Sequence, residues 1–214
     1  RRDFQHCHQV EKYNNFINKS LNTQFCAGEL IIYSDNSLKE KSNVTRKKLP
    51  MLGINPGASY GSSKRWYPEE FANVAAKLSS QYDITILGGP TEIDISMDIQ
   101  KLLVKKGVTN YQNLAGSLNI SELIHHISNL DLFITGDSGP MHIAASYQIP
   151  TVSIFGPTRD NETSQWLNQK SIIVKKNLDC QPCMKRVCPL KHHNCMKLIK
   201  AKDILIEVQS LNYL

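Results

Sequence analysis

From about residue 50 onward, short apolar segments alternate with longer segments that carry apolar residues at helical spacing. The segment that begins at Pro68, for example, places Phe71, Val74, Ala75 and Leu78 on one helix face. Short buried strands that alternate with amphipathic helices are typical of a parallel sheet covered by helices on both faces. The sequence therefore predicts a doubly wound α/β fold, in which ligands bind beyond the carboxyl ends of the strands.

The predicted elements follow one another in the order expected for such a sheet. We expect strands at residues 52–55, 84–87, 110–114, 132–135, 152–155 and 172–174. We expect helices at residues 92–105 and 203–211, and further helices that begin at Pro68, at Ser121 and after Pro140.

The region before this pattern is different. Residues 10–21 have the apolar spacing of an amphipathic helix, and residues 28–33 are predicted as a short strand. Residues 34–49 are rich in Asp, Asn, Ser, Lys and Arg and poor in apolar side chains, which predicts an exposed linker.

Size and charge narrow the class of protein. With 214 residues and 41% hydrophobic residues, the chain is long enough for one large α/β domain, or for one domain with part of another. Its net charge of +6 suits anionic ligands or an anionic membrane surface. No apolar run approaches 18 residues and residues 1–11 are polar, so we expect a cytoplasmic protein without a transmembrane segment. The start at Arg1 suggests a trimmed or partial polypeptide.

Three turns at strand ends have the composition of anion sites. Residues 131–142 run from an apolar strand through Gly136, Asp137, Ser138 and Gly139 into a helix with Pro140 in its first turn. Free N–H groups and the helix dipole attract an anion at such a helix start. Glycine-containing turns also follow the strands that end near residues 55 and 155. The alternative is an ordinary capped turn, because Asp and Ser frequently begin helices.

Four motifs together resemble a known family, and they lie at residues 53–66, 113–116, 135–145 and 154–158. They are similar to the ADP-heptose:lipopolysaccharide heptosyltransferases, most closely to the heptosyltransferase II type. This family has two Rossmann-like domains that face each other across a cleft, the GT-B architecture. The resemblance implies that residues 50–214 form the second, nucleotide-sugar-binding domain, and that residues 1–49 are the end of the first domain and the interdomain linker.

The resemblance also implies an activity. The family transfers L-glycero-D-manno-heptose from ADP-heptose to the inner core of lipopolysaccharide, so the implied partners are this donor and a lipopolysaccharide acceptor at the cytoplasmic membrane face. It implies no nucleic-acid partner and no cofactor for catalysis. The family's N-terminal motif, to which acceptor contacts and the catalytic base are assigned, has no counterpart here. We therefore expect the chain to bind donor better than it turns donor over, with its catalytic residues unknown.

The resemblance assigns donor contacts to particular residues. A departing diphosphate gains negative charge, so cations and N–H donors are needed beside it. Lys64 with its neighbouring serines could neutralise one phosphate, the turn at Gly136 could hold the other, and Glu92 could reach the adenosine. The predicted donor-binding residues are Ser62, Ser63, Lys64, Glu92, Asp137, Ser138, Gly139 and His142.

Simpler interpretations remain open for several of these residues. Lys64 could be a solvated surface lysine, His142 a core histidine, and Glu92 an ordinary helix-start acid. Asp137 would orient backbone or ligand hydroxyl groups rather than touch phosphate, because two anions repel.

Four cysteines near the C-terminus have a spacing compatible with structural zinc: Cys180, Cys183, Cys188 and Cys195. Free thiols are an equally good hypothesis, and disulfides are less expected in a reducing cytosol. His192 and His193 lie between the last two cysteines. In either case we expect the cluster to fold a C-terminal loop away from the donor chemistry.

Two other functions are weighed against glycosyl transfer. A dinucleotide-dependent oxidoreductase would need G-x-G-x-x-G after its first strand, whereas the glycines here are Gly53, Gly57 and Gly61. A nucleic-acid-binding zinc module would use the basic cysteine cluster but would leave the three turns unexplained.

Overall fold

A six-stranded parallel sheet forms the centre of the computed structural model, which describes residues 7–33, 49–58 and 60–211. The strands are β1 (Met51–Asn55), β2 (Asp83–Ile86), β3 (Tyr111–Asn113), β4 (Leu132–Gly136), β5 (Thr151–Ile154) and β6 (Ser171–Val174). Their order is β3-β2-β1-β4-β5-β6, and every neighbouring pair is parallel. The predicted doubly wound fold is confirmed, with each strand end within one residue of its predicted position.

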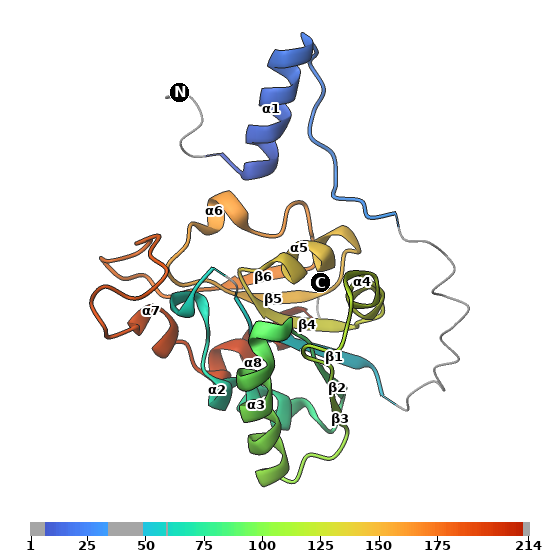
Figure 1. Ribbon diagram of the computed structural model, residues 1–214, viewed down its shortest axis with the longest axis vertical. Coiled ribbons are helices and arrows are strands. Elements are labelled where there is room, and N and C mark those ends of the chain that lie inside the picture. The colour runs from blue at the N-terminus through green and yellow to red at the C-terminus, as the bar shows by residue number, and fades with distance from the viewer. Residues whose placement is uncertain (1–6, 34–48, 59, 212–214) are drawn as a thin grey trace.

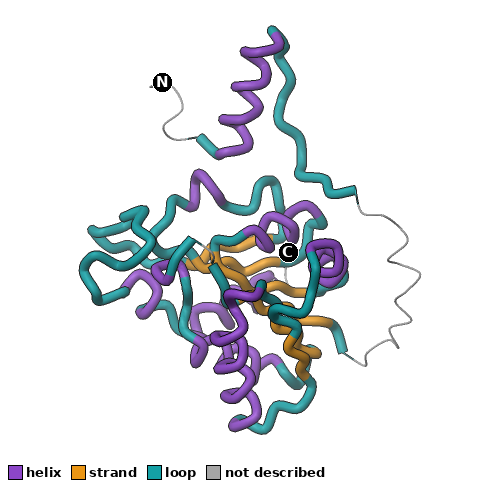
Figure 2. Tube along the Cα trace, viewed as in Figure 1, coloured by secondary structure: helices purple, strands orange, loops and turns teal. Residues whose placement is uncertain are grey.

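Helices cover both faces of the sheet (Figures 1 and 2). On one face, α2 (Pro68–Leu78) packs against α3 (Ile93–Lys105) and α8 (Ala201–Leu211). On the other face, α4 (Ile120–Ser128) packs against α5 (Gly139–Ser146). Each face has its own apolar cluster, and neighbouring residues of β4 divide between them: Ile134 belongs to the first cluster and Phe133 to the second.

The predicted apolar face of α2 agrees with the observed burial, whereas the apolar side chains of α1 (Gln9–Leu21) are not buried. Phe71, Val74, Ala75 and Leu78 of α2 are all buried. Ile127 of α4 is buried as well. The short helices α6 (Asp160–Thr163) and α7 (Asn194–Lys197) and the 3₁₀ turns η2 (Ser62–Lys64) and η3 (Pro90–Glu92) were not expected. Elements of three or four residues are too short for periodicity to reveal them.

The N-terminal segment stands apart from the sheet (Figure 1). Helix α1 (Gln9–Leu21) begins with a capping box between His8 and Glu11, and it has no buried residue. It is attached at its base, where Lys12 pairs with Glu162 at 3.1 Å and His8 Nε2 lies 3.0 Å from the Ser164 carbonyl oxygen. Burial would raise the pKa of the Glu162 carboxyl, but hydrogen bonds from Lys12 and Arg159 hold it below its ordinary value.

The predicted strand at residues 28–33 is wrong, because these residues pair with no strand of the sheet. The Gly28 carbonyl instead accepts a hydrogen bond from the Trp166 indole at 2.8 Å. Most of the linker predicted at residues 34–49 lies outside the described residues.

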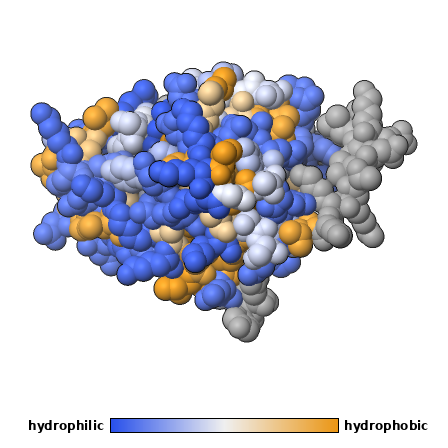
Figure 3. All heavy atoms as spheres, turned by 90° about the horizontal axis from the view of Figure 1, so that it is seen from below, coloured by the Kyte–Doolittle hydropathy of each residue, from blue (hydrophilic) through white to orange (hydrophobic). Residues whose placement is uncertain are grey.

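Apolar side chains are exposed on α1, where Tyr13, Phe16, Ile17 and Leu21 are each more than half exposed. The face in Figure 3 is mainly hydrophilic, with small and separate apolar groups. In the part of the chain that the structure describes, no helix has both the length and the apolar character needed to cross a membrane.

Candidate functional site

A cavity of about 370 Å³ opens where β1 and β4 lie side by side, beyond their carboxyl ends. In this strand order the chain turns in opposite directions from these two strands, which is where doubly wound sheets bind ligands. The lining comes from the turns after β1, β2 and β4, and includes Asn55, Gly57, Gly88 and Gly89.

Most of the predicted donor residues meet in this cavity, and two do not. Those that line it are Lys64, Glu92, Asp137, Ser138, Gly139 and His142. Ser62 lies outside the lining, and Ser63 is buried with its hydroxyl donated to the Lys185 carbonyl. The two serines therefore flank the lysine without facing the cavity.

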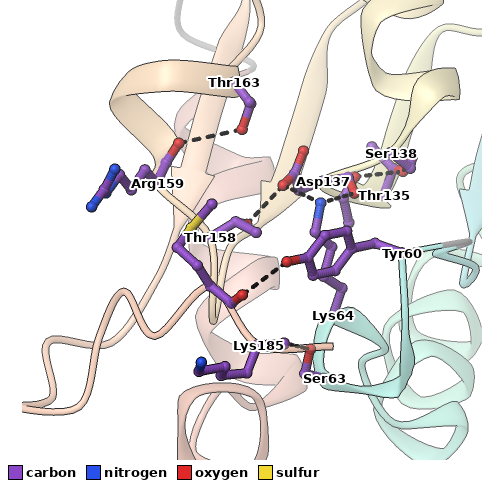
Figure 4. Close-up of polar contacts among 12 residues, drawn as sticks. Tyr60, Ser63, Lys64, Thr135, Asp137, Ser138, Thr158, Arg159, Thr163 and Lys185 are labelled. Atoms are coloured by element: carbon purple, nitrogen blue, oxygen red, sulfur yellow. Dashed lines mark hydrogen bonds and ion pairs between the residues drawn. The ribbon is translucent and has the colours of Figure 1, made fainter. Parts of the chain in front are cut away.

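Lys64 is fixed by an ion pair rather than solvated (Figure 4). Its Nζ lies 2.6 Å from Asp137 Oδ2, and its side chain is only 12% exposed. Thr158 Oγ1 donates to the same Asp137 oxygen at 2.7 Å. The Lys64 ammonium also lies 4.7 Å from the centre of the Tyr60 ring. The alternative of a solvated surface lysine is thus wrong, and a cation has a fixed position at the cavity.

The start of α5 borders the same cavity, with Gly139 in the lining. Ser138 is the N-cap in an extended conformation, yet its side chain makes no capping hydrogen bond. Its hydroxyl instead lies 3.1 Å from Asn55 Nδ2 and 3.1 Å from Thr135 Oγ1. Pro140 has no N–H and the Met141 N–H donates to the Ser138 carbonyl at 3.2 Å, so the uncapped first turn leaves the Gly139 N–H to bind an anion.

Glu92 is held across two of the turns. Its carboxylate accepts from the Gly89 N–H at 2.9 Å and from Thr91 Oγ1 at 2.7 Å, and Arg65 Nη2 lies 3.8 Å away. A Cβ on Gly57 would overlap Glu92 Cγ, so only glycine leaves room for this side chain. Glu92 thus begins a helix and also presents a fixed acceptor to the cavity.

His142 is largely buried on the cavity wall. Burial lowers the pKa of its imidazole, and this outweighs Asp137, which raises it; His8 and Lys64 lower it further. The neutral ring is therefore the favoured form near pH 7.

A consequence for stability can be measured. In the unfolded chain His142 has a pKa of about 6.5, and in the folded chain its pKa is lower. As the pH falls below about 6.5, the unfolded chain therefore binds a proton more readily than the folded chain. The free energy of unfolding that is present above this pH is lost as the pH falls. We expect H142Q to flatten the decrease in unfolding free energy between about pH 7 and pH 5.5, measured by urea denaturation. A slope in H142Q identical to that of wild type would contradict the assignment.

The segment that carries the four C-terminal cysteines packs on the Lys64 turn. We call residues 180–195 the cysteine loop and residues 60–64 the Lys64 turn. The Ser63 N–H donates to the Arg186 carbonyl at 3.1 Å, and Tyr60 Oη donates to the Met184 carbonyl at 2.9 Å. The expectation that this loop lies away from the donor turns is therefore wrong: chain topology brings together segments more than 120 residues apart.

The cysteines themselves are thiols in this structure. All six lie in the described part of the chain, and none forms a disulfide. Among the described side chains, no group of three or more His, Cys, Asp or Glu is arranged to hold a metal ion. Burial raises the pKa of the Cys195 thiol to about 11, and Cys183, Cys188 and Cys180 contribute to this increase. Free thiols and structural zinc therefore both stay predictions.

Thiol chemistry tests these alternatives. We expect a thiol-specific reagent to label exposed Cys26 quickly and buried, weakly acidic Cys195 last, because the thiolate is the reactive form. All six thiols should titrate in denaturant. About one zinc per chain by elemental analysis, with a chelator lowering the melting temperature, would instead support a structural metal.

A second cavity of about 540 Å³ lies beyond β5 and β6. It is larger, and its cations have acidic partners, as Lys64 does: Arg159 pairs with Glu162, Lys175 with Asp160, and Lys176 with Asp203. Thr158 lines it while donating to Asp137, so this hydrogen bond separates the two cavities. The smaller cavity is the better candidate because it combines a fixed cation with an uncapped helix start.

Sequence reasoning did not single out Asn55 or Thr158 as site residues. Asn55 lies at the end of β1 and Thr158 shortly after β5, and both positions fall within the motifs at residues 53–66 and 154–158. Their position at or after a strand end was the available signal, since side chains there face the ligand edge of the sheet.

Comparisons with known proteins show the family to which the chain is similar. The family model for glycosyltransferase family 9 (heptosyltransferase) matches residues 2–194. Lipooligosaccharide heptosyltransferase 2 of Campylobacter jejuni subsp. jejuni serotype O:6 is 42% identical over 207 residues, which are 96% of this chain and 65% of that protein. The chain thus spans about 65% of the length of this relative.

Solved structures share the fold. Escherichia coli ADP-heptose LPS heptosyltransferase II superposes with a TM-score of 0.71 at 23% identity, covering 88% of this chain and 54% of the other. The E. coli heptosyltransferase WaaC with ADP superposes with a TM-score of 0.66 at 14% identity, covering 97% of this chain and 57% of the other.

Proposed function

The chain belongs to glycosyltransferase family 9, and on this premise we propose that its cavity binds the ADP part of ADP-heptose. The complete protein would then transfer heptose from this donor to the inner core of lipopolysaccharide. The proposal is supported by a relative named lipooligosaccharide heptosyltransferase 2 and by the structure of a similar heptosyltransferase with ADP.

The observation that carries the proposal is a fixed cation facing an uncapped helix start. Lys64 has three N–H donors, and Asp137 accepts through Oδ2 at 2.6 Å and through its backbone carbonyl at 3.4 Å, so one donor remains for a phosphate. The Gly139 N–H, at the positive end of the α5 dipole, would bind the second phosphate. Both groups would stabilise the negative charge that develops on ADP as its bond to the sugar breaks.

Asp137 would have a separate task in this reaction. Its Oδ2 atom is engaged by Lys64 and Thr158, which leaves Oδ1 to accept a hydrogen bond from a donor hydroxyl. Glu92 would bind adenosine hydroxyl groups in the same manner, because its carboxylate is held in place by Gly89 and Thr91. Neutral His142 would add one ring N–H or one acceptor to the wall.

Family membership disfavours the oxidoreductase alternative, and so does the absence of G-x-G-x-x-G after β1. Calorimetric titration with ADP, UDP and NAD tests the choice. ADP should bind most tightly. UDP should bind more weakly, because Glu92 and the glycine turns would meet a different base and ribose position. NAD should bind more weakly than UDP. Failure of ADP to bind, or tighter binding of NAD, would overturn the proposal.

Turnover is expected to need a second domain. We propose that acceptor contacts and the catalytic base lie in the part of the relatives that this chain does not match. We also propose that the complete protein works as a two-domain enzyme at the cytoplasmic face of the membrane. Residues 1–214 alone should release no ADP from ADP-heptose with a heptosylated inner-core acceptor. Addition of the missing N-terminal domain should restore the release of ADP, which mass spectrometry would detect. Rapid release by residues 1–214 alone would place the base within this chain.

A further inference from the structure

The feature left unexplained is the close packing of the cysteine loop on the Lys64 turn. Every polar group of Ser63 is engaged by this loop. Its N–H donates to the Arg186 carbonyl, its hydroxyl to the Lys185 carbonyl, and its carbonyl faces His193 Nε2 at 2.8 Å. Ser63 is 2% exposed, so water does not compete for these bonds.

His193 connects this serine to the start of α2. Its second ring nitrogen, Nδ1, lies 3.1 Å from Tyr67 Oη, and Tyr67 is the N-cap of α2. A carbonyl oxygen can only accept, so Nε2 carries a ring proton towards Ser63, while the Tyr67 hydroxyl can either donate to Nδ1 or accept from it. His193 holds this position with a left-handed backbone, at φ 51°.

The residues that determine where Lys64 points lie within this contact. Ser63 directly precedes Lys64, and Tyr60, whose ring lies under the ammonium, is bound to the Met184 carbonyl. Figure 4 shows the Lys185 and Tyr60 contacts on one side of Lys64 and Asp137 on the other. Gly61 also touches the loop, because a Cβ there would overlap the Arg186 carbonyl oxygen.

From these contacts we propose that His193 is a positioning residue for donor binding: it holds Ser63, and through Ser63 it keeps the Lys64 ammonium at the phosphate site. The inference rests on the proposed function, because it requires that Lys64 contacts the diphosphate. It gives the cysteine loop a task that requires no metal.

Adjacent histidines provide a matched test in the full chain. Asn tolerates the left-handed backbone of residue 193 but is too short to bridge Ser63 and Tyr67, so H193N removes the contact with little backbone strain. H192N is the control, because the hydrogen bond of His192 Nδ1 stays within the loop, to the Asn194 N–H. We expect H193N to bind ADP about tenfold more weakly and H192N to remain within about twofold of wild type.

Two further measurements separate positioning from general damage. Adenosine lacks phosphates, so its affinity, measured by NMR titration, should not change in H193N. Hydrogen exchange of the peptide that contains Ser63 and Lys64 should become faster in H193N and stay the same in H192N. Unchanged ADP affinity in H193N, or equal losses for ADP and adenosine, would overturn the inference. If wild type does not bind ADP, the proposed function fails. Unchanged hydrogen exchange in H193N would separately refute the role of His193 in holding Ser63.

Discussion

Replacement of Lys64 with alanine is expected to weaken ADP binding by roughly tenfold to a hundredfold. A charge-assisted hydrogen bond to phosphate contributes about 1.5–3 kcal/mol, and each 1.4 kcal/mol corresponds to about tenfold in affinity. Lys64 is a cation in the cavity lining, and its position is fixed by Asp137 and by the Tyr60 ring. Calorimetric titration of K64A and wild type with ADP measures the effect.

Two controls make this result interpretable. K101A removes an exposed lysine that pairs with Asp98 on α3, and it should leave ADP affinity unchanged. K64A also leaves Asp137 buried beside an empty position, which lowers stability. The double variant K64A/D137N removes that unpaired charge, so its stability should partly recover while ADP binding stays weak. ADP binding by K64A as tight as that by wild type would refute the phosphate role of Lys64.

The fold was largely predictable, because buried parallel strands and amphipathic helices leave a strong local pattern. Buried strand positions require apolar side chains, and this pattern can be read directly from the sequence, as at Leu52, Ile54 and Ile134. Residues 28–33 have an equally suitable composition but form no strand, because strand formation depends on a neighbour that the local sequence does not specify.

The site was predictable in part, for a related physical reason. Lys64, Asp137 and Glu92 lie in turns that follow strands, and the sheet topology brings such turns together. The contacts that hold these residues were not predictable. Ser63 was expected to face a phosphate, whereas its hydroxyl bonds to a loop 122 residues away. Such long-range pairs are specified only by the packed structure.

Gly57 should be intolerant of even one added methyl group. A Cβ there would overlap Glu92 Cγ and lie 2.6 Å from Glu92 Cδ, so G57A must displace the carboxylate or the turn. Overpacking of this kind costs about 1–3 kcal/mol. We therefore expect G57A to lower the free energy of unfolding by that amount, measured by urea denaturation, and to weaken ADP binding. G28A is the control, because a Cβ at Gly28 meets no atom within 4 Å.

A double-mutant cycle identifies Glu92 as the cause. E92A creates the room that the added methyl group needs, but it leaves the Gly89 N–H and the Thr91 hydroxyl without their acceptor. If the clash is the dominant effect, G57A/E92A will be less destabilised than the sum of the single variants, because neighbouring residues do not contribute additively. ADP binding should nevertheless stay weak, since the double variant lacks the carboxylate proposed to bind adenosine. Strict additivity in stability would show that the methyl group acts on the backbone of the turn and not through Glu92.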